Sequence, residues 1–113
     1  MDFTVGQIKD GVVVVAISGS LNDMGSEAFL KQADGLIAEG VRKFVLDCTE
    51  LDFVSSFGLG VLVRLRKRFA EAGGRVAMAS VPDEVMAVLK ITALDKVLMI
   101  YPDVETARLS LMT

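Results

Sequence analysis

The sequence contains no histidine among its 113 residues, and this absence excludes several classes of enzyme. Without histidine, the chain forms neither a Ser-His-Asp triad nor a Cys-His pair, and it lacks the commonest neutral metal ligand. It has no Gly-Lys-Ser or Gly-Lys-Thr triplet, and therefore no P-loop to cradle nucleotide phosphates. The loop acids Asp23, Asp47 and Asp52 are better explained as helix caps or solvated charges than as cation ligands. We therefore expect a protein that is not an enzyme and that holds no metal or cofactor.

Cysteine, long apolar runs and positive charge are scarce as well. Cys48 is the only cysteine, so no intramolecular disulfide can form, and such a chain suits a reducing cytoplasm. No run approaches the roughly 18 apolar residues of a membrane span, and the first ten residues lack the apolar segment of a signal peptide. The net charge of −3 argues against a nucleic-acid surface, and the stripe Arg64, Lys67 and Arg68 is typical of a solvated helix face. We expect a cytoplasmic protein with no nucleic-acid partner and no direct membrane insertion.

What the sequence does have is a hydrophobic content of 52%, arranged in alternating strand and helix patterns. A chain of this length can bury a core as one domain, so we expect a single domain over residues 1–113. Residues 2–18 predict a β-hairpin with its turn at Asp10-Gly11. The patterns that follow are a helix over 26–40, a strand at 43–48, a helix after the serines at 55 and 56, a strand at 75–80, a short helix after Pro82, a strand at 96–100 and a helix capped by Asp103.

This order of elements predicts an α/β fold. Strands separated by helices join through right-handed crossovers into a mostly parallel sheet, here with an N-terminal β-hairpin at one edge and about four helices. Ligands and partners of such sheets meet the loops at the carboxyl ends of the strands. Two of these loops stand out, "GSLNDMGS" at 19–26 and "TELDFVSSFG" at 49–58. We expect the functional site at these loops.

The second loop places Ser55 and Ser56 just before an amphipathic helix. One interpretation is structural: either hydroxyl accepts a hydrogen bond from the first free amides, worth about 1 kcal/mol, while Gly58 and Gly60 allow tight packing. The other interpretation is regulatory. A phosphate on one serine would face unpaired N–H groups and the positive end of the helix dipole. Its charge of about −1.5 to −2 would oppose an acidic or apolar partner surface.

The stretch "FVLDCTELDFVSSFGLGVLVRL" resembles the signature of STAS domains, specifically of the bacterial anti-sigma-factor antagonists. The usual form in that family is an apolar strand, a polar loop and then Asp-Ser-Ser-Gly-Leu-Gly or Ser-Ser-Ala-Gly-Leu before an amphipathic helix. The resemblance extends over nearly the whole chain, because the hairpin, "ISGSLND", "VPDEVMAVLKITALDKVLMIY" and the closing helix also fall where the family has its elements. The resemblance thus implies a single STAS-like domain.

The same resemblance implies a function. It suggests a small regulator that binds a GHKL-type serine kinase, which also acts as an anti-sigma factor. Binding frees the sigma factor, phosphorylation of the antagonist by that kinase reverses the binding, and a phosphatase would reset the serine. An alternative is a non-catalytic STAS subunit of a membrane transporter or another signalling assembly. A small enzyme using the loop acids is a third interpretation, disfavoured by the missing histidine and P-loop.

The resemblance also assigns site residues. In family members with Ser-Ala before the glycine, the acceptor is the serine two places before it, which corresponds to Ser56 here. Phe57 stands immediately before the glycine and cannot be phosphorylated, so the acceptor is one of the two serines before it, with Ser55 as the alternative to Ser56. In "GSLND", similar to the family's Gly-x-Leu-Asp, either Asn22 or Asp23 takes the aspartate's role. Phe57 is equally explained as a partner anchor or a helix staple. The predicted partner-binding residues are Asn22, Asp23, Met24, Phe57, Gly58 and Leu59.

Overall fold

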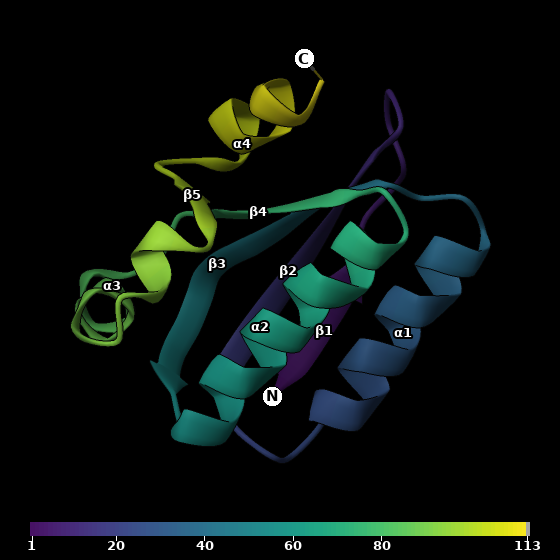
Figure 1. Ribbon diagram of the computed structural model, residues 1–113. Helices are drawn as coiled ribbons and strands as arrows, with labels where there is room; N and C mark the ends of the chain where they lie inside the picture. Colours follow the sequence, from purple (N-terminus) through teal and green to yellow (C-terminus); the bar gives the residue numbers. More distant parts are fainter. Residues whose placement is uncertain (113) are drawn as a thin grey trace.

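Five strands form one mixed sheet in the order β1-β2-β3-β4-β5 in the computed structural model, which describes residues 1–112 (Figure 1). Strand β1 (Asp2–Val5) pairs antiparallel with β2 (Val12–Leu21). Strands β2, β3 (Lys43–Val54), β4 (Arg75–Ala79) and β5 (Met99–Tyr101) run parallel to one another. The predicted α/β class, with an N-terminal hairpin on a parallel sheet, is confirmed.

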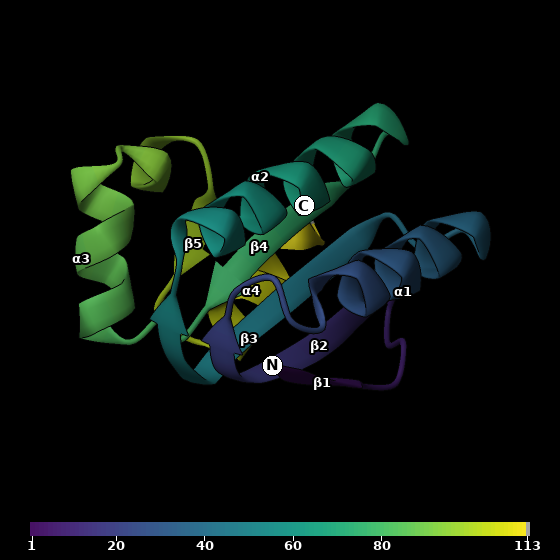
Figure 2. The same ribbon diagram turned by 90° about the horizontal axis from the view of Figure 1, so that it is seen from below.

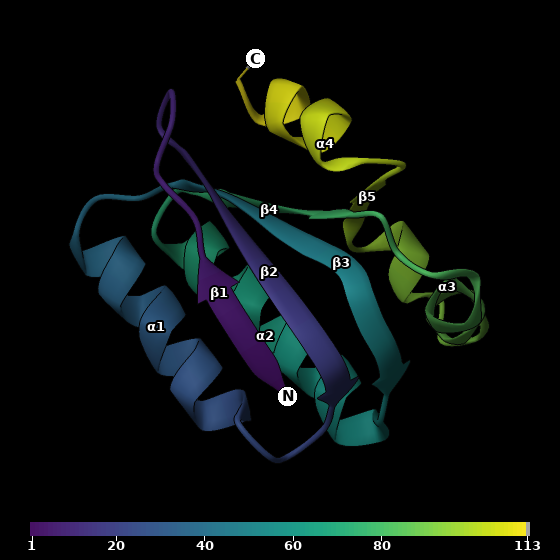
Figure 3. The same cartoon turned by 180° about the vertical axis from the view of Figure 1, so that it is seen from behind.

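The helices cover the two faces of the sheet unequally. Helices α1 (Ser26–Ala38) and α2 (Ser56–Glu71) lie side by side on one face (Figure 2). Helix α4 (Val104–Leu111) packs on the opposite face, mainly against β4 and β3, and leaves β1 uncovered there (Figure 3). Helix α3 (Asp83–Ile91) lies beside the far end of β3 and leads into the one-turn 3₁₀ helix η1 (Leu94–Lys96). The four α-helices match the predicted number.

The core has two parts because the central strands are buried on both faces. Toward α1 and α2, four aromatic rings form a continuous row, with centroid separations of 5.6 Å for Phe3 to Phe29, 6.5 Å for Phe29 to Phe44 and 5.1 Å for Phe44 to Phe69. The first two pairs meet edge to face, a geometry that adds to the energy of simple burial, and the third pair is tilted. Toward α4, a smaller cluster contains Val12, Val45, Ala77, Ala79, Ala107 and Leu111.

The hairpin turn lies where the sequence predicts it. Asp10 and Gly11 both have positive φ angles, 54° and 78°, as a type I′ turn requires. Lys9 and Val12 exchange two backbone hydrogen bonds of 2.9 Å across this turn. Aspartate and glycine are among the residues that tolerate this left-handed backbone, which is why the dipeptide is a reliable signal.

Several boundaries differ from the sequence prediction. Strands β2 and β3 continue to Leu21 and Val54, through residues predicted as loop, because they keep pairing across two register shifts. This pairing joins distant segments, so the local composition does not reveal it. Helix α1 is capped by Gly25 at φ 79°, and Ser26, predicted as the cap, is its buried first residue. Strand β5 is shorter than the predicted strand at 96–100 and ends one residue later, since Lys96 belongs to η1 and pairing with β4 begins only at Met99.

The packing of α2 on the sheet predicts a specific loss of stability. Leu62 and Leu65 are 2% and 1% exposed and belong to the larger part of the core, so Leu62→Ala or Leu65→Ala should each lower the free energy of unfolding by about 2–5 kcal/mol. Val63, on the exposed side of the same helix, provides the control, and Val63→Ala should change stability by less than about 0.5 kcal/mol. Urea denaturation measures all three. Equal effects at the three positions would contradict this packing.

Candidate functional site

The two predicted loops meet at the start of α2, where Ser55 joins them. The Ser55 backbone N–H and its hydroxyl both donate to the carbonyl oxygen of Leu21, at 3.0 and 3.2 Å. The Ser55 Oγ in turn accepts from the Gly58 N–H at 3.0 Å, which makes Ser55 the N-cap of α2. This hydroxyl is therefore committed to the fold, and the structural interpretation of the serine pair applies to Ser55.

Ser56 lies in a different environment from its neighbour. It is the first residue of α2, it is exposed, and its hydroxyl makes no hydrogen bond with any residue in 1–112. The first N–H groups of a helix have no intrahelical acceptor, and the helix dipole places partial positive charge there. The Ser56 hydroxyl thus stands free beside donors that favour an anion. It can be reached from solvent without disturbing the cap.

Gly58 brings α2 unusually close to β2. A Cβ atom at this position would lie 2.1 Å from the Leu21 carbonyl oxygen, so only glycine fits. Gly58 is buried, and Leu59 is half-buried against the core. Both help to fix the start of the helix, and partner contact through either residue stays a prediction.

The loop between β2 and α1 is folded by Asn22. Its side-chain oxygen accepts from the Met24 N–H at 2.9 Å, and its backbone carbonyl accepts from the hydroxyl of the buried Ser26. Asn22 therefore shapes the loop, whereas Asp23 and Met24 are exposed at its tip. Asparagine is common in such turns because its side chain can accept a hydrogen bond from the backbone N–H two residues further on. Which of Asn22 and Asp23 contacts a partner stays a prediction.

Three large apolar side chains are exposed on the segments that meet here, one on the loop after β2, one near the end of β3 and one in the first turn of α2. Met24 is 72% exposed, Phe57 is 48% exposed, and Phe53 near the end of β3 is 55% exposed. Phe57 does not pack into the core; its ring lies under the guanidinium of Arg64, with Arg64 Cζ 5.4 Å from the ring centroid. The staple interpretation of Phe57 thus loses its support. Phe53 was not among the predicted site residues, because its exposure depends on the pairing of Phe53 with Ser20 after a register shift.

The remaining polar groups near the site are engaged in local structure. Asp52 accepts a hydrogen bond from the Ser20 hydroxyl at 3.2 Å, and Asp47 accepts from both the N–H and the hydroxyl of Thr49. Within residues 1–112, no three His, Cys, Asp or Glu side chains gather as a metal site would require. Burial raises the pKa of the Cys48 thiol from 9.0 to about 12, with the nearby Asp47 carboxylate adding to the effect, so the thiolate nucleophile is not available near neutral pH.

A family model described as the STAS domain matches residues 5–107 of the chain. The chain belongs to the STAS domain family. An anti-sigma F factor antagonist from Paenibacillus polymyxa is 33% identical to it over 92 residues, which cover 80% of this chain and 79% of the relative. Relatives at about this identity are named anti-sigma factor antagonists, a group that is typically non-catalytic.

Solved structures also match the STAS chain. A crystal structure from Thermotoga maritima, provisionally named as an anti-sigma factor antagonist, superposes with a TM-score of 0.89 and 29% identity, covering 98% of this chain and 95% of that one. The anti-sigma factor antagonist SpoIIAA in its unphosphorylated form has a TM-score of 0.74 and 16% identity, with 96% of each chain covered. At that identity SpoIIAA shows the fold alone. Across residues 1–112, no helix of this STAS protein is both long and apolar enough to span a bilayer.

Two glycines of α2 give a test of how the site is built. Gly58→Ala would push a Cβ into the Leu21 carbonyl and should lower the free energy of unfolding by about 1–3 kcal/mol. Gly60, two residues on, faces open space, so Gly60→Ala should instead stabilise the protein by up to about 1 kcal/mol through helix propensity. Urea denaturation of the two variants decides between them. A Gly58→Ala variant as stable as wild type would refute the close approach of α2 to β2.

Proposed function

We propose that this STAS protein is an anti-sigma factor antagonist that is switched off by phosphorylation of Ser56. Its partner is an anti-sigma factor that is also a GHKL-type serine kinase, and binding to it releases a sigma factor. The observation that carries the proposal is the exposed, unbonded hydroxyl of Ser56 at the first residue of α2, beside the exposed side chain of Phe57. The names of the relatives support an anti-sigma factor as the partner.

The geometry favours Ser56 over Ser55 as the acceptor. Phosphorylation of Ser55 would break two hydrogen bonds of its hydroxyl, one to the Leu21 carbonyl and one from the Gly58 N–H. Phosphorylation of Ser56 breaks none with residues 1–112: the hydroxyl loses its proton, the γ-phosphoryl group of ATP is transferred to Oγ, and ADP leaves. The new dianion lies at the positive end of α2, where the fold tolerates it.

The same charge is unfavourable for a bound partner. Met24, Phe53 and Phe57 make the site edge apolar, and a partner that covers them removes water from their neighbourhood. Covering a phosphate of about −1.5 to −2 charge at Ser56 with an apolar partner surface would then cost the phosphate much of its hydration. Phosphorylation therefore weakens the complex, and a phosphatase that removes the group restores it. We propose that residues 1–113 act as one domain, as a cytoplasmic binding protein without catalysis and without a nucleic-acid partner.

The position of the modification is the first consequence to test. Incubation with ATP and the cognate kinase should add one phosphate, and mass spectrometry should place it on Ser56. A Ser56→Ala variant should take up no phosphate under the same conditions. Modification at Ser55 alone, or only outside residues 52–60, would overturn the assignment.

The effect on the complex is the second consequence. Ser56→Asp places a charge at the interface and should weaken the kinase complex by about 30-fold to several thousand-fold, the range for a buried unpaired charge. Asparagine has the same size as aspartate but no charge, so Ser56→Asn serves as the matched control. Titration calorimetry should show wild-type affinity for Ser56→Asn and Ser56→Ala.

Stability measurements separate this effect from helix capping. Ser55→Ala removes the cap and should lower the free energy of unfolding by about 0.5–2 kcal/mol, whereas the three Ser56 variants should change it little. Equal kinase affinity for Ser56→Asp, Ser56→Asn and the phosphorylated protein would contradict the proposed switch.

A further inference from the structure

We propose that Arg64 is the intramolecular partner of the phosphate on Ser56, and that it exchanges the ring of Phe57 for the phosphate when the serine is modified. The inference deepens the proposed function, because it rests on Ser56 as the modified residue and names the side chain that receives the charge. It concerns a contact within the chain, so it can be measured without the kinase or any other partner.

The spacing along α2 brings the two residues to the same side of the helix. Ser56, Gly60 and Arg64 recur at intervals of four, each turned by about 40° with about 6 Å of rise, so Arg64 lies about 80° around the helix from Ser56, within the same broad stripe. Gly60 has no side chain, and a Cβ there would meet nothing within 4 Å. The path along the helix surface from Arg64 to Ser56 is therefore open.

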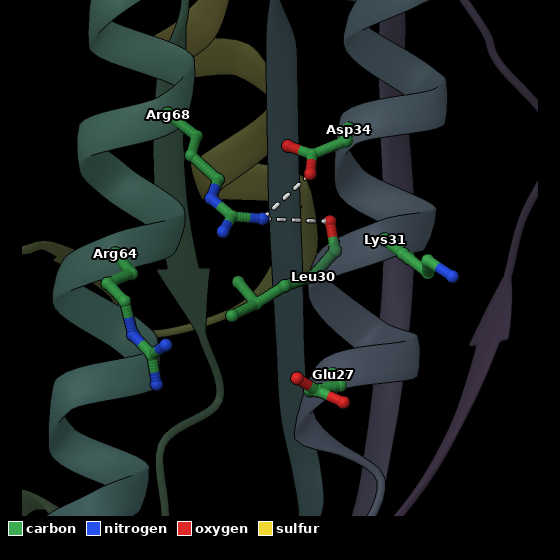
Figure 4. A pocket seen from close by; sticks show the side chains of 6 residues that line it. All are labelled: Glu27, Leu30, Lys31, Asp34, Arg64 and Arg68. Atoms are coloured by element: carbon green, nitrogen blue, oxygen red, sulfur yellow. Dashed lines mark hydrogen bonds and ion pairs between the residues drawn. The ribbon is translucent and has the colours of Figure 1, made fainter.

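The side chain of Arg64 already reaches the first turn. Its Cζ lies 5.4 Å from the centroid of the ring of Phe57, the residue that follows Ser56. Helical side chains point toward the N-terminus of their helix, so the guanidinium extends in the direction of Ser56. A groove between α1 and α2 is lined by Glu27, Leu30, Lys31, Asp34, Arg64 and Arg68. Figure 4 shows the Arg64 side chain directed along α2, whereas the Arg68 side chain crosses this groove toward α1.

The two arginines of this groove differ in what neutralises them. Arg68 forms an ion pair with Asp34 at 2.8 Å. Arg64 has no carboxylate within 4 Å among residues 1–112, although Glu27 lines the opposite wall of the groove (Figure 4). The other charged side chain facing this space is Lys31, on α1. Arg64 is thus the cation near Ser56 whose charge is available.

A phosphate is a stronger partner for arginine than an exposed ring. Guanidinium binds phosphate oxygens through paired, charge-assisted hydrogen bonds, whereas an exposed cation–π contact is a weak interaction. Once Ser56 is phosphorylated, Arg64 moves from the ring to the phosphate and one face of Phe57 becomes uncovered. The modification then changes both the charge and the apolar surface at the site.

The experiment uses the whole chain with phosphoserine incorporated at position 56 during translation. Phosphorus NMR titration gives the second pKa of the phosphate, which is near 6 in a free phosphoserine. A nearby cation lowers this pKa, so Arg64→Gln should raise it by about 0.2–0.7 unit relative to the wild-type chain. Arg64→Lys keeps the charge without the planar fork and should raise the pKa by less.

Arg66→Gln is the matched control, because Arg66 is also exposed on α2 but lines a different cavity with Ala70 and Gly74. It should leave the pKa unchanged. In addition, proton NMR of the Arg64 side chain should show loss of the shift caused by the Phe57 ring when Ser56 is phosphorylated. Equal pKa values for Arg64→Gln and Arg66→Gln, or an Arg64 shift unaffected by phosphorylation, would overturn the inference.

The two proposals fail in different ways. If no kinase modifies Ser56, the proposed function is lost, but the phosphoserine chain still reports whether Arg64 binds the phosphate. If Arg64 does not lower the phosphate pKa, this inference fails, and the mapping of phosphate onto Ser56 is unaffected.

Discussion

The carbonyl oxygen of Leu21 is the acceptor on which the geometry of the site depends. It receives two hydrogen bonds from Ser55, and the absence of a side chain at Gly58 lets α2 approach it. Because Leu21 ends β2 and Ser55 caps α2, these contacts fix the helix relative to the sheet edge. They also determine that Ser55, and not Ser56, has its hydroxyl engaged in the fold. The position of Ser56 follows from the use of Ser55 as the cap.

The parts of the fold that could be predicted from sequence are those with local causes. The turn at Asp10-Gly11 could be predicted because both residues accept a left-handed backbone. The cap at Asp103 could be predicted because its carboxylate accepts a hydrogen bond from the Thr106 N–H, three residues further on. The extension of β3 could not be predicted in this way. Its residues Glu50 and Asp52 are polar and exposed, and only pairing with β2, more than thirty residues away, makes them a strand.

The sequence was sufficient to predict where in the fold the site lies, but not the role of each residue in it. The serine pair pointed to the start of α2, yet which hydroxyl caps the helix depends on where the helix begins, to a single residue. Asn22 raised the same difficulty, since its hydrogen bond to the Met24 N–H forms only in the folded loop. Arg64 was expected to belong to a solvated stripe, and its contact with Phe57 appears only with side chains in place.

The different lengths of β3 and β4 affect how the site edge moves. Pairing of β3 with β4 ends at Asp47 and Ala79, while β3 remains paired with β2 as far as Val54. Beyond Asp47 the strand therefore has a strand neighbour on one side and helix α3 on the other. Segments with fewer ladder hydrogen bonds open locally at lower free energy than the centre of a sheet. Amide hydrogens of this outer part of β3 should therefore exchange sooner than that of Val45, and this edge can adjust its shape while the rest of the sheet stays closed.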